Sequence, residues 1–279
     1  MSDLLVHAAW LASHRDEVVV ADVRWSATGG TAEAEPAFEA GHIPGAAFFD
    51  VDRDLAGVPF VDGPGRHPLP KPGRFAARLA ASGIAPGDRV VAYDDGIGSV
   101  AARLWWMLDG IGTRCALLDG GLAAWEGPLE TGPAAARSAA EADVRPWPED
   151  RLVDADGVAE ALRAGEVVID ARVGERYRGE TEPIDPVAGH IPGARSAPFP
   201  DVVGTDGRFR SSDELRERFR GVGVSDSMVP IAYCGSGVTA SLDVFALKLA
   251  GLGEARLYEG SWSDWVHDPL RPVATGAEP

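Results

Sequence analysis

The sequence Gly41-His42-Ile43-Pro44-Gly45-Ala46 returns, residue for residue, as Gly189-His190-Ile191-Pro192-Gly193-Ala194, 148 positions later. At the same offset, the Asp-x-Arg that ends an apolar run at Asp22 recurs at Asp170. Two later blocks, residues 90–94 and 117–125, recur as residues 230–234 and 257–265. Their offset is 140, so the second copy is eight residues shorter between its blocks. Such self-similarity predicts two copies of one domain.

Within each copy, short β-branched runs alternate with helical patterns, which favours parallel strands joined by crossover helices. The first copy predicts strands at 17–22, 89–93 and 115–119 and helices near 73–82 and 99–109. The second predicts strands at 166–170, 229–233 and 255–258 and helices near 155–164, 212–220 and 240–250. The predicted fold class is therefore α/β, with two tandem domains that each contain a parallel sheet with helices on both faces.

The domain boundaries follow from the repeat. Residues 127–150 are rich in Ala, Pro and Glu and lack an apolar period, so they are interpreted as a linker. The predicted domains are residues 1–126 and 151–279. A length of 279 residues agrees with two domains of ordinary size.

Composition and charge exclude several classes of function. Hydrophobic residues make up 45% of the chain and charged residues 25%, which is typical of a folded globular protein. The net charge of −17 repels phosphates and anionic lipids, so neither a nucleic-acid partner nor a membrane partner is expected. Residues 1–10 lack the basic start of a signal peptide, and two cysteines are too few for a disulfide framework. We expect a cytoplasmic protein with free thiols.

The two copies differ most where an apolar strand ends. The first copy continues as Asp94-Asp95-Gly96-Ile97-Gly98, whereas the second continues as Cys234-Gly235-Ser236-Gly237-Val238-Thr239-Ala240. Functional groups of parallel sheets lie beyond the carboxyl ends of strands. A glycine-bearing turn before a helix directs backbone N–H groups and the helix dipole at the sulfur, which favours the thiolate. Cys234 is therefore predicted to be a nucleophile, and the copy with Asp94 is predicted to be inactive.

Other interpretations of the cysteines carry less weight. The alternative for Cys234 is a structural role, as a small hydrophobic side chain buried in the core. A structural role is the preferred interpretation for Cys115, which lies within a predicted strand. A cysteine phosphatase needs an arginine at the position that Ala240 occupies, and the flanks lack a cysteine-protease signature. The histidines show no metal-ligand spacing, so we expect neither a metal nor another cofactor.

The doubled pattern of motifs resembles the two-domain rhodanese superfamily. The motifs are Asp-x-Arg, Gly-His-Ile-Pro-Gly-Ala, a strand leading to the cysteine loop, and Gly-Gly-x-x-x-Trp. The resemblance covers about 250 residues. It implies an inactive amino-terminal domain and a carboxy-terminal domain that transfers sulfur through its cysteine.

Within the superfamily, the neutral loop from Cys234 to Thr239 is similar to that of 3-mercaptopyruvate sulfurtransferases, whereas thiosulfate-using members typically carry a cationic loop. The resemblance implies catalytic roles for Ser236, His67 and Asp52, the last two from His-x-Leu-Pro and Asp-x-Asp motifs. From sequence alone, His67 would be interpreted as a surface or packing residue. Gly235, Gly237, Val238 and Thr239 would bind the donor with their loop.

Arg176 matches the family's substrate-binding arginine; the alternative is a surface arginine paired with Glu175 or Glu180. The family's second substrate arginine has no counterpart in residues 181–186. That gap is expected to be filled from another loop, by Arg66 or Arg178, or to remain unfilled.

Three functions are considered. The first is transfer of sulfur from 3-mercaptopyruvate through a Cys234 persulfide to a thiol such as thioredoxin, or to cyanide. The second is the same transfer from thiosulfate. The third is a binding module without catalysis, which the retained thiol argues against. The repeated tryptophans are predicted to serve packing; they are Trp105, Trp106, Trp262 and Trp265.

Overall fold

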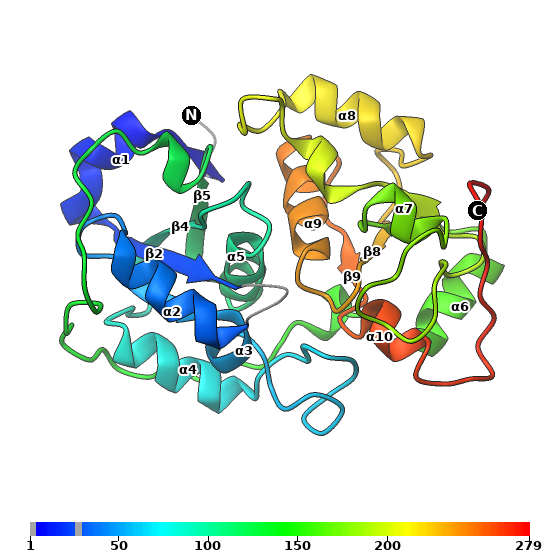
Figure 1. The fold of residues 1–279 in the computed structure, drawn as a ribbon, viewed down its shortest axis with the longest axis horizontal. Coiled ribbons are helices and arrows are strands. Elements are labelled where there is room, and N and C mark those ends of the chain that lie inside the picture. The colour runs from blue at the N-terminus through cyan, green and yellow to red at the C-terminus, as the bar shows by residue number, and fades with distance from the viewer. Residues whose placement is uncertain (1–3, 26–29) are drawn as a thin grey trace. The chain divides into compact units, whose positions relative to one another are not determined.

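A computed structural model describes residues 4–25 and 30–279 of the chain (Figure 1). Asp3, part of the amino-terminal stretch discussed above, lies outside the described residues. The chain divides into two compact units. Unit 1 comprises Met1–Gly57, Leu69–Pro148 and Thr205–Phe209, and unit 2 comprises Val58–Pro68, Glu149–Gly204 and Arg210–Pro279. Each unit therefore contains a short segment from the other half of the sequence, and the boundaries drawn from the repeat stay a prediction.

Unit 1 is built on a five-stranded sheet in which every neighbouring pair is parallel. The strand order is β1 (Leu5–Val6), β5 (Arg114–Leu118), β4 (Arg89–Tyr93), β2 (Val19–Arg24) and β3 (Ala47–Asp50). Parallel neighbours require crossover connections, which the helices provide. These are α1 (Ala8–His14), α2 (Thr31–Ala40), α3 (Val51–Asp54), α4 (Pro72–Ala81) and α5 (Ala101–Gly110).

Both faces of this sheet are buried. Val20, Val91 and Ala116 pack in one cluster with Leu11 of α1 and Phe38 of α2. The residues between them on the strands point to the opposite face because side chains alternate along a strand, and they are also buried. Helix α5 packs on that face, against β2, β4 and β5. The sheet is therefore the covered, parallel kind that the continuous apolar strands predicted.

Unit 2 repeats the design with four parallel strands. They are ordered β7 (Arg195–Ser196), β6 (Val168–Asp170), β8 (Ile231–Tyr233) and β9 (Arg256–Leu257). The helices are α6 (Ala155–Arg163), α7 (Gly174–Tyr177), α8 (Ser212–Gly221), α9 (Ala240–Leu249) and α10 (Ser261–Trp265). Val158 of α6 and Trp262 of α10 share one core with Ile231 of β8, while α9 contacts β8 and β9. The predicted fold class is confirmed.

The elements predicted from the apolar runs form within a few residues of their expected positions. The strands β1, β3 and β7 were not predicted, and β3 and β7 directly follow the Gly-His-Ile-Pro-Gly-Ala turns. The helices α1, α2, α3, α7 and α10 were not predicted either. The predicted linker contains no helix or strand before Glu149 and is hydrogen-bonded to unit 1. For example, Ala140 N–H donates to the carbonyl of Ala80, and Trp147 Nε1 donates to that of Pro70.

The repeated motifs have structural roles that explain their recurrence. Arg172 donates to the carboxylate of Asp170 and to the carbonyl of Gly189, which ties the end of β6 to the following turn. The Tyr233 hydroxyl accepts a hydrogen bond from Ile191 N–H at 3.2 Å. In unit 1, Arg24 makes the equivalent bonds to Asp22 and to the carbonyl of Gly41. The motifs therefore shape the two cores as well as the site.

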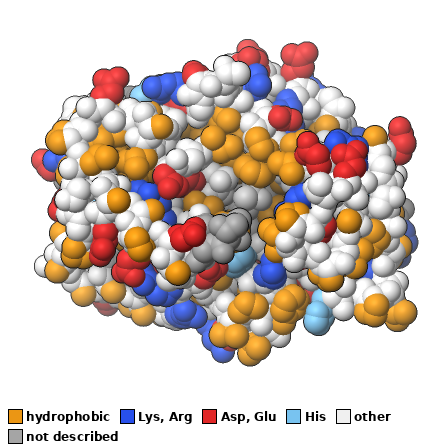
Figure 2. Space-filling view, viewed as in Figure 1, with side chains coloured by type: hydrophobic (Ala, Val, Ile, Leu, Met, Phe, Trp, Pro, Cys, Tyr) orange, Lys and Arg blue, Asp and Glu red, His pale blue; other side chains and the backbone are white. Residues whose placement is uncertain are grey.

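The surface and the remaining cysteine agree with the composition. Acidic side chains are spread over the face of the molecule that Figure 2 shows, in keeping with the net charge of −17. No helix in residues 4–25 and 30–279 is both long and apolar enough to span a bilayer. Cys115 is buried in β5, and burial raises the pKa of its thiol. The predicted packing role of the tryptophans fits their burial; Trp105, Trp106, Trp262 and Trp265 are all at most 2% exposed.

Candidate active site

Cys234 follows the last residue of β8 and begins the loop that leads into α9. Its side chain is buried, at 1% exposure. The start of α10 holds the loop: Cys234 N–H donates to Ser261 Oγ, and Trp262 N–H donates to the carbonyl of Cys234, both at 3.0 Å. At Gly237, φ is +76° and a Cβ atom would lie 2.3 Å from the carbonyl oxygen of Glu259, so only glycine fits there.

The equivalent loop of unit 1 shows what kind of group such a turn can hold. One carboxylate oxygen of Asp94 accepts hydrogen bonds from the N–H groups of Gly96 and Gly98, and the other accepts from Val100 and Ala101, at 2.8 to 3.1 Å. Burial raises the pKa of the Asp94 carboxyl, and the four N–H groups act in the opposite direction. A carboxylate attached to the chain thus occupies the anion cradle of unit 1. Cys234 stands at the matching position of unit 2.

Two of the predicted residues reach unit 2 on the segment Val58–Pro68, which comes from the amino-terminal half of the sequence. Arg66 N–H donates to Ser263 Oγ at 3.1 Å, and the ring of Phe60 stacks on His267 at 4.6 Å. Gly65 has φ of +75°, and a Cβ there would lie 2.5 Å from the carbonyl oxygen of Gly260. The segment therefore packs directly on the turn that precedes α10.

A hydrogen bond of 2.7 Å joins Nδ1 of His67 to Oγ of Ser236. Both side chains are buried, at 8% and 7% exposure, so His67 is not the surface residue that its loop context would predict. Ser236 lies two residues after Cys234 in the same loop. An imidazole and a hydroxyl in this arrangement can pass a proton to or from a group bound at the loop.

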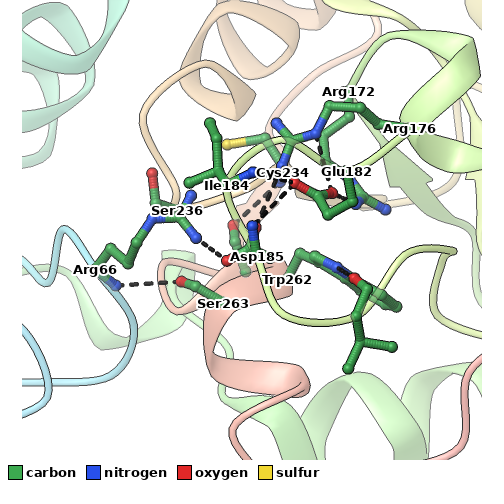
Figure 3. A network of polar contacts seen from close by, with 12 residues as sticks. Arg66, Arg172, Arg176, Glu182, Ile184, Asp185, Cys234, Ser236, Trp262 and Ser263 are labelled. Carbon is green, nitrogen blue, oxygen red and sulfur yellow. Dashed lines mark hydrogen bonds and ion pairs between the residues drawn. The ribbon is translucent and has the colours of Figure 1, made fainter. Parts of the chain in front are cut away.

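A group of arginines and carboxylates lies close to Cys234 (Figure 3). Arg176 pairs with Glu182 at 2.6 Å and with Asp185 at 3.2 Å, rather than with Glu175 or Glu180. Glu182 also pairs with Arg172 at 3.3 Å. Because both carboxylates are only 3% exposed, their charges need these partners.

Arg66 completes this group. One nitrogen of its guanidinium, Nη1, forms a short ion pair with Oδ1 of Asp185, so that the carboxylate of Asp185 lies between Arg66 and Arg176. Burial lowers the pKa of Arg66, the charge of Cys234 raises it, and the nearby Arg176 lowers it. Arg178 lies elsewhere, in an exposed ion pair with Glu180.

The remaining predicted residues occupy the following positions. Val238 is buried within the loop, and Thr239 is the residue before α9. Asp52 lies in α3 of unit 1, where its Oδ1 accepts a hydrogen bond from Trp25 Nε1 at 3.1 Å. The roles that the family resemblance implies for these residues stay predictions. Within residues 4–25 and 30–279, no cluster of three or more His, Cys, Asp or Glu side chains is arranged to hold a metal ion.

Sequence reasoning missed the two carboxylates and the two serines that hold the site together. Asp185 and Glu182 lie in residues 181–186, the stretch that lacks the family's second arginine. Ser261 and Ser263 follow the repeated glycine block, at positions where the first copy has Gly121 and Ala123. That difference between copies was a usable signal, because hydroxyl groups appear only in the copy with the cysteine.

Comparisons with known proteins identify the relatives of this chain. A family model described as "Rhodanese-like domain" matches residues 7–128 and 154–268. A "probable 3-mercaptopyruvate sulfurtransferase" of Pseudomonas aeruginosa is 48% identical over 250 residues, 86% of each chain. SseB of Mycobacterium tuberculosis, named as a candidate thiosulfate sulfurtransferase, is 38% identical over 268 residues, 94% of this chain and 92% of SseB. The crystal structure of SseA from Escherichia coli, described as a 3-mercaptopyruvate sulfotransferase with the rhodanese fold, has a TM-score of 0.81 and 34% identity, and the match covers 94% of this chain and 100% of SseA.

The chain belongs to the rhodanese family and contains two copies of its domain. It is an enzyme, a sulfurtransferase, and it is most similar to the 3-mercaptopyruvate sulfurtransferases. Catalysis, and not binding alone, is therefore its function.

The packing of Gly65 gives a first testable prediction. In Gly65→Ala, the new methyl group would meet Gly260 and displace Arg66 and His67, so we expect kcat/KM to fall by about 10- to 100-fold. Gly45→Ala is the matched control, because Gly45 has φ of +77° with nothing within 4 Å of a Cβ. Both variants carry the same backbone strain, of about 1 kcal/mol. Equal activities in the two variants would contradict the packing argument.

Proposed function

We propose that the enzyme takes sulfur from 3-mercaptopyruvate, holds it as a persulfide on Cys234, and passes it to a thiol acceptor. The observation that carries this proposal is the 2.7 Å hydrogen bond between His67 and Ser236 beside the cysteine loop. After sulfur transfer from mercaptopyruvate, the enolate of pyruvate leaves and needs a proton at carbon, and a hydroxyl–imidazole pair can supply that proton. Similarity to proteins named 3-mercaptopyruvate sulfurtransferases supports the same donor.

In the first half-reaction, the Cys234 thiolate attacks the sulfur of the donor. The new S–S bond forms as the C–S bond breaks, and the electron pair of the C–S bond remains on the enolate of pyruvate. The proton of the donor's thiol passes through Ser236 and His67 to the enolate carbon. The products are pyruvate and an anionic persulfide on Cys234, so that atoms and charge balance.

In the second half-reaction, an acceptor thiolate attacks the outer sulfur of the persulfide. It leaves with that sulfur as its own persulfide, and the Cys234 thiolate is restored. A small dithiol or thioredoxin is a suitable acceptor, and cyanide gives thiocyanate in the same way. The cytoplasm, which keeps thiols reduced, suits this chemistry and the two free cysteines.

The other proposed site residues support these two steps. The N–H groups of Gly235, Gly237, Val238 and Thr239 stabilise the anionic sulfur. Val238 is the position that matches Gly98, whose N–H binds the Asp94 carboxylate in unit 1. Arg176 binds the donor's carboxylate. Asp52 supports the orientation of His67, a role taken from the family resemblance. The amino-terminal copy transfers no sulfur, because Asp94 replaces the nucleophile.

Thiosulfate is the alternative donor, and the name of the Mycobacterium tuberculosis relative favours it. Its leaving group, sulfite, needs no proton at neutral pH, so the His67–Ser236 pair would then serve no chemical purpose. Thiosulfate is also a dianion, which gains from unpaired cations, whereas the arginines near Cys234 are already paired with carboxylates.

A donor comparison tests the proposal. The purified enzyme is incubated with 3-mercaptopyruvate or thiosulfate, with cyanide as acceptor, and pyruvate and thiocyanate are measured. We expect pyruvate release, and an intact mass increased by one sulfur atom when the acceptor is omitted. Cys234→Ser is the control and should show neither. Faster thiocyanate formation from thiosulfate, or a wild-type protein that never gains sulfur, would overturn the proposal.

A further inference from the structure

Ser261 adopts a backbone conformation that favours glycine. Its φ is +53°, in the left-handed region, and Phe60 is the only other non-glycine residue with a positive φ in residues 4–25 and 30–279. The matching residue of the first copy is Gly121, with φ of +55°. Glycine adopts this conformation without a steric penalty, whereas the Cβ atom of serine is crowded by the backbone. The copy that carries the cysteine therefore has a side chain where the other copy has the unstrained residue.

The hydroxyl of Ser261 makes two hydrogen bonds in the interior of unit 2. Its Oγ accepts from Cys234 N–H at 3.0 Å and donates to the carbonyl of Tyr258 at 2.8 Å. Ser261 is fully buried. Because a hydroxyl has a single proton, and Tyr258 accepts it, that proton is not available to the sulfur. The hydroxyl therefore acts on the backbone of Cys234 and not on the reacting atoms.

The side chain of Ser261 also affects the course of the cysteine loop. A Cβ atom on Gly121 would lie 2.6 Å from the carbonyl oxygen of Gly96, which is far closer than nonbonded atoms pack. The residue that matches Gly96 in unit 2 is Ser236. Since Ser261 does carry a Cβ atom, the cysteine loop cannot pass it on the course that the loop of unit 1 takes past Gly121.

Three consecutive residues of α10 hold the backbone around the nucleophile. Ser261 binds the N–H of Cys234 through its side chain, and Trp262 N–H donates to the carbonyl of Cys234 at 3.0 Å. Ser263 N–H donates to the carbonyl of Gly235, also at 3.0 Å. The peptide groups on both sides of the Cys234 Cα atom are therefore fixed. Rotation about the Cα–Cβ bond remains as the main freedom of the sulfur.

We infer that the hydroxyl of Ser261 is a positioning group for sulfur transfer: it fixes the peptide N–H of Cys234, so that the sulfur stays aligned with the amides of its loop in both half-reactions. The inference rests on the proposed function and deepens it, because it assigns a role to a residue outside the cysteine loop. Backbone strain is tolerated where a functional site requires a particular geometry, and the strain at Ser261 fits this pattern.

Two variants of Ser261 test the role of the hydroxyl. Ser261→Ala keeps the Cβ atom and the strain, Ser261→Gly removes both, and both variants lack the hydroxyl. We expect kcat for 3-mercaptopyruvate to fall about 10- to 100-fold in each, because a small misplacement of the nucleophile slows the chemical step. KM should stay within about threefold of the wild type, since the hydroxyl is bonded to the backbone and not to the donor. Rapid mixing should show both half-reactions slowed by similar factors.

Ser82→Ala is the matched control. It removes a buried hydroxyl from unit 1, at the end of α4, where Ser82 accepts a hydrogen bond from Arg78. This variant should keep the kcat and KM of the wild type. Denaturant unfolding of all three variants establishes that each is folded. If Ser261→Ala does not fold, Ser261→Gly provides the test alone, because glycine adopts the required conformation without strain, as Gly121 does.

The outcomes separate this inference from the proposed function. If the wild-type protein gains no sulfur from 3-mercaptopyruvate, the proposed function fails, while the kcat values of the variants still test the positioning role. If the wild type gains sulfur but either folded variant of Ser261 turns over at the wild-type rate, the positioning role fails alone. A raised KM with unchanged kcat would also overturn it, because Ser261 would then act on donor binding. Slowing of only one half-reaction would overturn it as well, since the alignment of the sulfur serves both.

Discussion

His67→Ala is expected to lower kcat/KM for 3-mercaptopyruvate by about 10²- to 10⁴-fold, the range of a general acid–base residue. The reason is local: His67 contacts Ser236 at 2.7 Å, and no proton can follow this route without the imidazole. The second half-reaction should be nearly unaffected, because attack of cyanide on a persulfide requires no proton transfer. Rapid-mixing measurements on protein loaded with sulfur by excess donor separate the two steps.

The double variant of His67→Ala and Ser236→Ala provides the control. Because the two side chains act as one relay, the double variant should lose about as much activity as either single variant. Losses that multiply would show that the two residues act independently. An equal slowing of both half-reactions would show that His67 supports the loop structure and transfers no proton.

Asp243→Asn is expected to have the largest effect on stability. Asp243 lies in α9, the helix that follows the cysteine loop; it is fully buried, and neither carboxylate oxygen has a hydrogen-bond partner among the described residues. The pKa of its carboxyl is raised to about 8, mainly by burial. The positive charge of Arg218 lowers this pKa, and the negative charges of Asp170 and Asp201 raise it further.

The direction of the pH dependence follows from this raised pKa. The folded protein keeps the proton up to about pH 8, whereas the unfolded chain releases it near the ordinary value of 3.8. The contribution of Asp243 to stability is therefore fully present below pH 3.8 and is lost as the pH rises through that window to about 8. Asn cannot ionise, so the stability advantage of the variant over the wild type should grow from about 2 kcal/mol at pH 5 to about 5 kcal/mol at pH 9.

Denaturant unfolding between pH 5 and 9 measures this effect. Asp213→Asn is the matched control, because the side chain of Asp213 is 91% exposed on α8. Its curve should run parallel to that of the wild type across the range. If the Asp243→Asn curve is also parallel, Asp243 does not titrate in this window.

The repeat made much of the fold predictable. Strands such as β2, β4 and β8 lie in apolar runs, and these runs recur between the two copies at offsets of 148 and 140 residues. Cys234 is proposed as the nucleophile for the same reason, since it stands where the other copy has Asp94. The strands β3 and β7 were not predicted, because neither contains the β-branched run that marks the other strands.

The partners of the arginines could not be predicted. Arg66 and Asp185 are separated by 119 positions, and neither has a local pattern that indicates the other. Arg176 has acidic neighbours in sequence at Glu175 and Glu180, yet its partners are Glu182 and Asp185. On a long helix, ion pairs can be predicted because paired residues are three or four positions apart. Arg176 lies in a four-residue helix followed by a loop, where no such fixed spacing applies.

The placement of Val58–Pro68 limits how the enzyme can be divided. A fragment excised at the linker, residues 151–279, would retain Cys234 and Ser236 but would lose His67 and Arg66. Under the proposed mechanism, the carboxy-terminal copy alone is therefore not a complete catalytic unit, although it contains Cys234 and its own core. Fusing it to another protein would transfer the cysteine loop without the His67–Ser236 hydrogen bond and the Arg66–Asp185 ion pair.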